Sequence, residues 1–160
     1  RNIDLTAVIL NNLNFGMTGG QVSGTTPPQR YTSTTAFGNP ERDFDICALA
    51  EAAGANYVAR CTPYHGWEMK ENMKEALTKK GFSVVEVVSP CPTHFGRHNE
   101  MKETPDMLHW LRDRAIAVEE YRRLPETERA ERLAIGTLVS RDVPDFNTQY
   151  ELVKARAQKG

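Results

Sequence analysis

The sequence lacks three features that would place it in a common class of protein. It has no long apolar run, and its longest ones, at residues 7–10 and 84–88, are far too short to cross a bilayer. It has no surplus of basic residues, since 20 Lys and Arg face 21 Asp and Glu, for a net charge of −1. It has no block of like charge either. We therefore expect neither a nucleic acid nor a membrane as partner.

Cysteine is also scarce. The three cysteines, Cys47, Cys61 and Cys91, are odd in number and widely spaced, which does not make a disulfide framework. This usage favours a reducing cytoplasm, and no secretory signal is visible. The chain opens on Arg1 and enters an apolar strand pattern by residue 3. We expect it to lack the N-terminal portion of its domain, although a processed N-terminus or a first edge strand would look the same.

Apolar runs alternate with helical patterns along the chain. Short aliphatic and β-branched runs predict strands at 3–10, 57–60, 82–88 and 135–139. Apolar residues at helical spacing predict helices at 43–53, at 67–79, from the Thr104-Pro105 cap onward, and after Pro144. This alternation predicts a single α/β domain, 1–160, with a mostly parallel sheet flanked by helices. Residues 100–160 would form a helical docking extension of it.

Two loops interrupt the alternation, and each follows a predicted strand. Residues 15–40 are rich in Gly, Thr, Ser and Pro, and residues 89–97 carry a cysteine between two prolines. Long loops in compact domains are usually functional or disordered. In open α/β sheets, ligands bind beyond the carboxyl ends of the strands. Both loops are therefore candidate binding segments.

The first loop contains residues suited to a magnesium diphosphate. Asn12 and a nearby backbone carbonyl offer the oxygen atoms that Mg²⁺ prefers. Glycines at 16, 19 and 20 let backbone N–H groups approach phosphate, and Thr18 and Gln21 can donate to it. The same residues also build ordinary turns, and the loop matches neither a P-loop nor a dinucleotide fingerprint.

The second loop offers a thiol and a cation. Cys91, held between prolines, suits a soft metal, but a lone cysteine is more often just a small buried residue. Arg97 can pair with a substrate carboxylate, a coenzyme A phosphate or an acidic residue of a partner. It can equally be a surface charge.

These two segments together carry a family resemblance. Residues 12–28, with Gly-Met-Thr-Gly-Gly-Gln at 16–21, resemble the thiamine-diphosphate loop of 2-oxoacid:ferredoxin oxidoreductase β subunits. The resemblance implies that the side chain of Asn12 and the backbone oxygen of Asn14 bind Mg²⁺. Gly16, Met17, Thr18, Gly19, Gly20 and Gln21 would then line the cofactor. The Gly-Asp-Gly motif that completes such sites is absent from this chain.

The segment Ser-Pro-Cys-Pro-Thr-His-Phe-Gly-Arg at 89–97 resembles the β-subunit stretch that supplies the last cysteine to a [4Fe-4S] cluster. The resemblance assigns that ligand to Cys91 and places the other ligands outside this chain. Cys47, on the apolar side of a predicted helix, and Cys61, at a strand end, are expected to be structural.

The resemblance covers residues 3–139 and implies a function. It is nearest to enzymes that convert 2-oxoglutarate and coenzyme A to succinyl-CoA and pass electrons through the cluster to ferredoxin, or run the reverse carboxylation. It also implies an α subunit as partner. No residue of this chain is expected to be catalytic itself, and the isolated chain is expected to be inactive. Three alternatives stay open: a pyruvate or branched-chain enzyme, an assembly subunit without catalysis, and, from pattern alone, a flavodoxin-like nucleotide-binding module.

Overall fold

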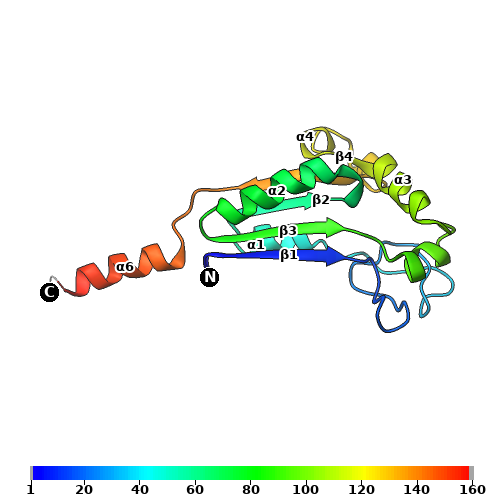
Figure 1. Ribbon diagram of the computed structural model, residues 1–160, viewed down its shortest axis with the longest axis horizontal. Coiled ribbons are helices and arrows are strands. Elements are labelled where there is room, and N and C mark those ends of the chain that lie inside the picture. The colour runs from blue at the N-terminus through cyan, green and yellow to red at the C-terminus, as the bar shows by residue number, and fades with distance from the viewer. Residues whose placement is uncertain (1, 159–160) are drawn as a thin grey trace.

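The computed structural model describes residues 2–158, which form a five-stranded sheet with helices on both faces (Figure 1). The strands lie in the order β1-β3-β2-β5-β4. Their bounds are β1 Leu5–Asn11, β2 Tyr57–Cys61, β3 Phe82–Val88, β4 Ala115–Ala117 and β5 Leu133–Ser140. The helices are α1 Ile46–Ala52, α2 Gly66–Thr78, α3 Thr104–Arg114, α4 Val118–Tyr121, α5 Glu126–Arg129 and α6 Phe146–Ala157. The predicted α/β class is confirmed.

The three strands that the sequence predicts as buried form the parallel part of the sheet. β3 lies between β1 and β2 and pairs with both in parallel, so that Val85 faces Val8 on one side and Ala59 on the other. β5 pairs with β2 in the antiparallel direction, and β4 pairs with β5 in parallel. Because β1, β2 and β3 point the same way, the segments that follow them gather at one edge of the sheet (Figure 1).

Two apolar layers hold the sheet between its helices. On the α1 face the buried residues are Cys47, Ala50, Ala55, Val58, Val84 and Val139. On the α2 face they are Tyr57, Ala59, Cys61, Ala76, Val85 and Val87. β2 and β3 are buried on both faces, which explains their nearly continuous aliphatic runs. The prediction that the first strand is buried was wrong, because β1 lies at the edge of the sheet and Leu5, Val8 and Leu10 are exposed. The helices therefore cover the middle of the sheet, and the loops that follow β1 and β3 lie at its carboxyl edge.

Some local predictions were wrong. The N-cap of α3 is Glu103 rather than Thr104, because the Asp106 carboxylate accepts from the backbone N–H of Glu103 at 3.1 Å. Helical spacing predicts inward positions for Ala115 on the helix after Thr104 and for Leu77 on the helix at 67–79, and both predictions were wrong. Ala115 lies beyond the end of α3 and begins β4, where it pairs with β5. Leu77 is exposed, since Ala76 takes the inward position on α2.

Residues 100–160, predicted as a helical extension, contribute β4 and β5 to the sheet as well as α3 to α6. The final helix, α6, extends away from the sheet in Figure 1, and its apolar side chains at Tyr150 and Val153 are exposed. No helix within residues 2–158 is both long and apolar enough to span a membrane.

Candidate functional site

The segments that follow β1 and β3 are joined to each other at the carboxyl edge of the sheet. The backbone N–H of Ser89 donates to the carbonyl of Asn11 at 2.9 Å, and that of Cys91 donates to the carbonyl of Asn12 at 3.1 Å. The ladder between the two strands thus continues past their ends. It places the predicted magnesium turn directly beside the predicted cluster cysteine.

The turn after β1 presents Asn12 to solvent and holds its neighbours inside. Leu13 is buried and adopts a positive φ of 59°, which is uncommon for a residue other than glycine. The side-chain oxygen of Asn11 accepts from the Leu13 N–H at 3.0 Å and so supports this conformation. Asn12 is exposed, and within the described residues no hydrogen bond engages its side chain. The Asn12 carboxamide is therefore available to a ligand.

Asn14, the second predicted magnesium ligand, is buried. Its carboxamide lies between the Asn12 carbonyl, 3.3 Å away, and the Phe95 N–H, 3.2 Å away, so that it bridges the two loops. Its backbone oxygen accepts from the Gly16 N–H at 3.1 Å. An open cavity of about 560 Å³ begins at this turn. Its lining includes Asn11, Asn12, Asn14, Gly16, Met17, Thr18, Ser23, Thr25 and Phe44.

The predicted cofactor loop closes on itself beside the cavity. The N–H groups of Phe15 and Gly20 donate to the carbonyls of Gln21 and Phe15 at 3.0 and 2.9 Å. The Thr18 hydroxyl donates to the Gln21 side-chain oxygen at 2.6 Å, so these two polar side chains are bonded to each other. Met17, also predicted to line the cofactor, is fully exposed. Diphosphate binding through Thr18 and Gln21 would require them to exchange this contact.

Glycine is needed where the loop packs against the cysteine segment. A Cβ at Gly16 would lie 3.0 Å from the Cys91 sulfur. A Cβ at Gly20, whose φ is +81°, would lie 2.7 Å from the Cβ of His94. The second segment turns there through a π-helical turn, Pro92–Gly96. The glycine backbone of one loop is thus closely packed against the Cys91 and His94 side chains of the other, so a side chain added at either glycine must displace the second loop.

The three cysteines differ in their surroundings. Cys91 is partly buried beside Gly16, whereas Cys47 and Cys61 are buried in the two core layers, as predicted. Burial raises the pKa of the Cys61 thiol to about 11 and raises that of Cys47 still further. Both thiols are therefore protonated near neutral pH in the metal-free protein. Arg97 is exposed, and no carboxylate pairs with it among the described residues.

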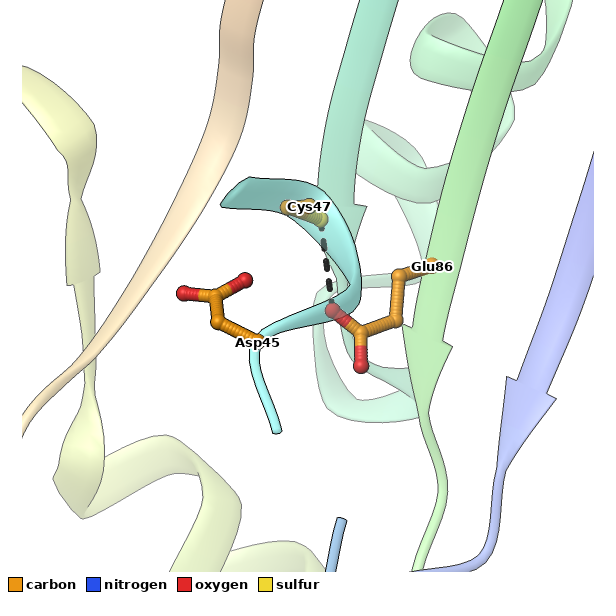
Figure 2. Close-up of side chains that lie close together, drawn as sticks. All are labelled: Asp45, Cys47 and Glu86. Carbon is orange, nitrogen blue, oxygen red and sulfur yellow. Dashed lines mark hydrogen bonds between the residues drawn. The ribbon is translucent and has the colours of Figure 1, made fainter. Parts of the chain in front are cut away.

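Sequence reasoning missed a buried ionic network behind the turn. Glu86 on β3 is 3% exposed and accepts from Arg60 Nε at 2.7 Å, from Asn11 Nδ2 at 2.7 Å and from the Cys47 thiol at 3.3 Å. Arg60 also pairs with Asp45 at 2.5 Å. Figure 2 shows Glu86 reaching from β3 toward Cys47 at the start of α1, just after Asp45. The signal in the sequence is a Glu inside one predicted strand and an Arg inside another.

Within residues 2–158, the three side chains Asp45, Cys47 and Glu86 are close enough to share a metal ion. Arg60, which contacts both carboxylates, already supplies the positive charge there. We therefore interpret the group as an ion-pair network. At the turn, by contrast, the available donors are an unbonded amide oxygen and backbone carbonyls, which suit Mg²⁺.

Comparisons with known proteins identify the family and the fold of this chain. The model of the thiamine pyrophosphate enzyme C-terminal TPP binding domain matches residues 1–87. The 2-oxoglutarate synthase subunit KorB of Methanocaldococcus jannaschii is 40% identical over 146 residues, which are 91% of this chain and 54% of that protein. KorB of Archaeoglobus fulgidus is 57% identical over 94 residues, or 59% of this chain and 35% of the relative.

The 2-oxoacid:ferredoxin oxidoreductase β subunit of Saccharolobus solfataricus is 36% identical over 100 residues, 62% of this chain and 33% of the relative. Among solved structures, a 2-oxoglutarate:ferredoxin oxidoreductase from Magnetococcus marinus, with 2-oxoglutarate, coenzyme A and succinyl-CoA bound, superimposes with a TM-score of 0.77. It covers 98% of this chain and 54% of its own, at 24% identity, and so establishes the fold. Three KorB relatives match this chain along 91% or more of its length. The chain spans only about half the length of each of them.

Proposed function

Because the chain belongs to the thiamine pyrophosphate enzymes, as a C-terminal TPP-binding domain, we propose that it serves in the β subunit of a 2-oxoglutarate:ferredoxin oxidoreductase. The reaction would be the coenzyme A-dependent oxidation of 2-oxoglutarate to succinyl-CoA, or its reverse. The similarity to 2-oxoglutarate synthase subunits along 91% or more of the chain supports this substrate. A pyruvate or branched-chain 2-oxoacid enzyme is the second candidate, because other relatives are described only as 2-oxoacid enzymes.

The observation that carries the proposal is the junction of the two loops. The Asn12 side chain faces solvent with no hydrogen-bond partner within residues 2–158, while the Asn12 backbone carbonyl accepts from the N–H of Cys91. We assign a magnesium ligand to the Asn12 side chain and another to the backbone oxygen of Asn14. Residues 16–21 would contact the diphosphate. When bound, thiamine diphosphate supplies the carbanion that attacks the 2-oxoacid.

Cys91 would supply one thiolate to a [4Fe-4S] cluster at the same edge. The backbone link from Cys91 to Asn12 keeps the cysteine beside the cofactor turn, which suits electron transfer between the two groups. The remaining cluster ligands would come from outside this chain. Arg97, exposed and without a carboxylate partner among the described residues, would meet the substrate, coenzyme A or the α subunit. Ferredoxin would accept the electrons.

The proposal includes a cytoplasmic location, supported by three free cysteines. It also includes a docking role for residues 100–160, supported by the exposed apolar side chains of α6.

The experiment is a paired measurement on the full-length subunit in its native complex. Anaerobic dye reduction with a panel of 2-oxoacids, with and without coenzyme A, tests the reaction. We expect coenzyme A-dependent reduction with 2-oxoglutarate well above pyruvate. Preference for pyruvate would change the substrate and keep the family. No reduction from a preparation that holds thiamine diphosphate and iron would refute the oxidoreductase and favour an assembly subunit.

Mg²⁺ binding tests the site separately. We expect Asn12→Ala to weaken Mg²⁺ binding at saturating thiamine diphosphate with little change in Tm, because this side chain is exposed and unbonded within the described residues. Lys74→Ala, at an exposed position on α2 whose ion pair with Glu71 is also exposed, is the control and should change neither quantity. Equal Mg²⁺ affinity of the Asn12 variant and the unchanged protein would exclude Asn12 as a ligand.

A further inference from the structure

We propose that Glu86 is a positioning residue that holds the magnesium-binding turn in shape through Asn11. This inference rests on the proposed function, since it concerns the same turn. Glu86 lies on β3, directly opposite Arg60 on β2, in the face of the sheet covered by α1. Within residues 2–158 it makes no hydrogen bond to Asn12 or Asn14. Its effect on the metal must therefore act through the side chains that it bonds.

The first step is that burial commits both carboxylate oxygens of Glu86 to protein donors. A carboxylate that is 3% exposed is costly unless it is paired and hydrogen-bonded. Oε2 accepts from Arg60 Nε at 2.7 Å and from the Cys47 thiol at 3.3 Å. Oε1 accepts from Asn11 Nδ2 at 2.7 Å. Glu86 is held in one orientation, and Oε1 is fixed as an acceptor aimed at Asn11.

The second step is that Glu86 decides which way the Asn11 amide faces. A carboxylate only accepts, so the NH₂ group of Asn11 must point toward Glu86. The Asn11 oxygen is then directed at the other side, where it accepts from Leu13 N at 3.0 Å and from the Thr25 hydroxyl at 2.7 Å. In the opposite orientation the Asn11 oxygen would face the Glu86 carboxylate, which is a second acceptor. The Asn11 NH₂ group would face the Leu13 N–H, which is a second donor. A single carboxylate therefore sets two further hydrogen bonds.

The third step connects these bonds to the metal ligands. Leu13 lies between Asn12 and Asn14, and its φ of 59° needs support because residues with a Cβ rarely adopt it. The bond from Leu13 N to the Asn11 oxygen supplies that support. The bond from Thr25 ties the turn to the loop that lines the same cavity. Loss of the Asn11 orientation would release both contacts and let the two magnesium donors move apart.

The far end of the network anchors Glu86 to the fold. Arg60, which is largely buried, pairs with Asp45 at 2.5 Å, and Asp45 also caps α1 by accepting from Ala48 N at 2.9 Å. The network thus runs from the start of α1 to the Asn11 turn. Asp45 is half exposed, so its pairing with Arg60 is screened by solvent and matters less than the buried contacts of Glu86.

The test compares Mg²⁺ affinity with stability in the full-length subunit within its complex. Glu86→Gln keeps the shape of the side chain but gives it an NH₂ group that must face either Asn11 or Arg60. Val85→Ala, the neighbouring buried residue on the other face of β3, is the control for a purely structural loss. Apo complex saturated with thiamine diphosphate is titrated with MgCl₂ by calorimetry, and Tm is measured for each protein.

We expect Glu86→Gln to weaken Mg²⁺ binding by about 10-fold or more, the usual size for a residue that orients a ligand. Val85→Ala should lower Tm and leave Mg²⁺ affinity unchanged. Asn11→Ala should weaken binding similarly, and adding Glu86→Gln to it should cause no further loss, because both act through one amide. If Glu86→Gln does not fold, Asn11→Ala against Val85→Ala decides the question.

The outcomes separate the inference from the function on which it rests. Failure of the unchanged complex to bind Mg²⁺ with thiamine diphosphate would overturn both. Normal binding by the unchanged complex, together with equal Mg²⁺ affinity in Glu86→Gln, would overturn the inference alone. Equal losses of affinity in Val85→Ala and Glu86→Gln would also overturn it, since the effect would then follow stability rather than orientation.

Discussion

Replacing Gly20 by Ala should be the most damaging alanine substitution among three glycines of the cofactor loop. Gly20 combines a positive φ of +81° with a close approach to the π-helical turn after Cys91. A Cβ there would lie 2.7 Å from His94 Cβ and 2.8 Å from His94 Cγ. The His94 Cβ cannot move without its backbone, and the cysteine segment carries that backbone. Relief of the clash must therefore separate the two loops.

Two other glycines of the same loop separate the two expected causes of destabilisation, which are backbone strain and overpacking. Gly19 has a φ of +111°, but a Cβ there would meet only Gln21 Nε2, at 3.8 Å. Gly19→Ala should thus lose about 1–3 kcal/mol from backbone strain alone. Gly20→Ala should add about 1–3 kcal/mol of overpacking to a similar strain. At Gly24 a Cβ would lie an ordinary 3.8 Å from Phe44 Cβ. Gly24→Ala should be neutral, or stabilising by about 0.4–1 kcal/mol.

Urea unfolding of the full-length subunit, followed by circular dichroism, measures the free energy of unfolding of each variant. The comparison holds when the variants share the same m-value, the slope of that free energy against urea concentration. The reasoning predicts stability in the order Gly24→Ala, then Gly19→Ala, then Gly20→Ala. Bound iron, measured on the same preparations, should fall for Gly20→Ala first, since His94 and Cys91 share one turn. If Gly20→Ala is as stable as Gly19→Ala, the close packing of the two loops is wrong.

Four further measurements test other parts of the structure. Leu111, on α3, has a side chain that is 1% exposed, so Leu111→Ala should lower the free energy of unfolding in urea by about 2–5 kcal/mol. A decrease below about 1 kcal/mol would place Leu111 outside the core. Asp45→Ala should lose about 1 kcal/mol because it removes the α1 cap, whereas Asp45→Asn, which can still cap, should lose less. Iodoacetamide at pH 8 should label Cys91 in cluster-free protein and spare Cys47 and Cys61, whose thiol pKa is raised by burial; mass spectrometry of the intact protein checks this. The pKa of the Cys61 thiol is about 11 in the folded protein and about 8.5 in the unfolded chain. The contribution of this buried thiol to stability is therefore complete below about pH 8.5 and is lost as pH rises through about 11. Urea unfolding measured across that pH range would detect the loss.

The sequence predicted those parts of the fold that local patterns determine. The strand at 82–88 was predicted with its observed bounds, because a β-branched run ends there at a serine and a proline. Gly54 directly follows the predicted helix at 43–53, and its φ of +88° shows why glycine is suited to that helix end. The two candidate loops were also located correctly. Both loops follow parallel strands, and the carboxyl ends of parallel strands lie at the same edge of a sheet.

The parts that were missed depend on contacts far apart in the sequence. The run at 135–139 gives no sign that β5 is antiparallel to β2, because strand direction follows from how the chain returns to the sheet. Ala115 continues the helical spacing of apolar residues, yet it lies in β4 and pairs with Leu133 of β5. Leu77 fits the helical stripe, but the adjacent Ala76 takes the inward position on α2, so Leu77 is exposed.

Glu86 shows why a charge inside a strand is informative even when its partner is unknown. A carboxylate among valines in a strand covered on both faces cannot remain unpaired, so a cation has to lie in a neighbouring strand or helix. Arg60, in another predicted strand, is such a cation, and the parallel register places it directly opposite Glu86. Satisfying Arg60 still leaves Oε1 of Glu86 free for a donor, and Asn11 at the end of β1 supplies it. The carboxylate therefore lies where the sheet can transmit its orientation to the turn that would bind the metal, which an isolated ion pair deeper in the sheet would not do.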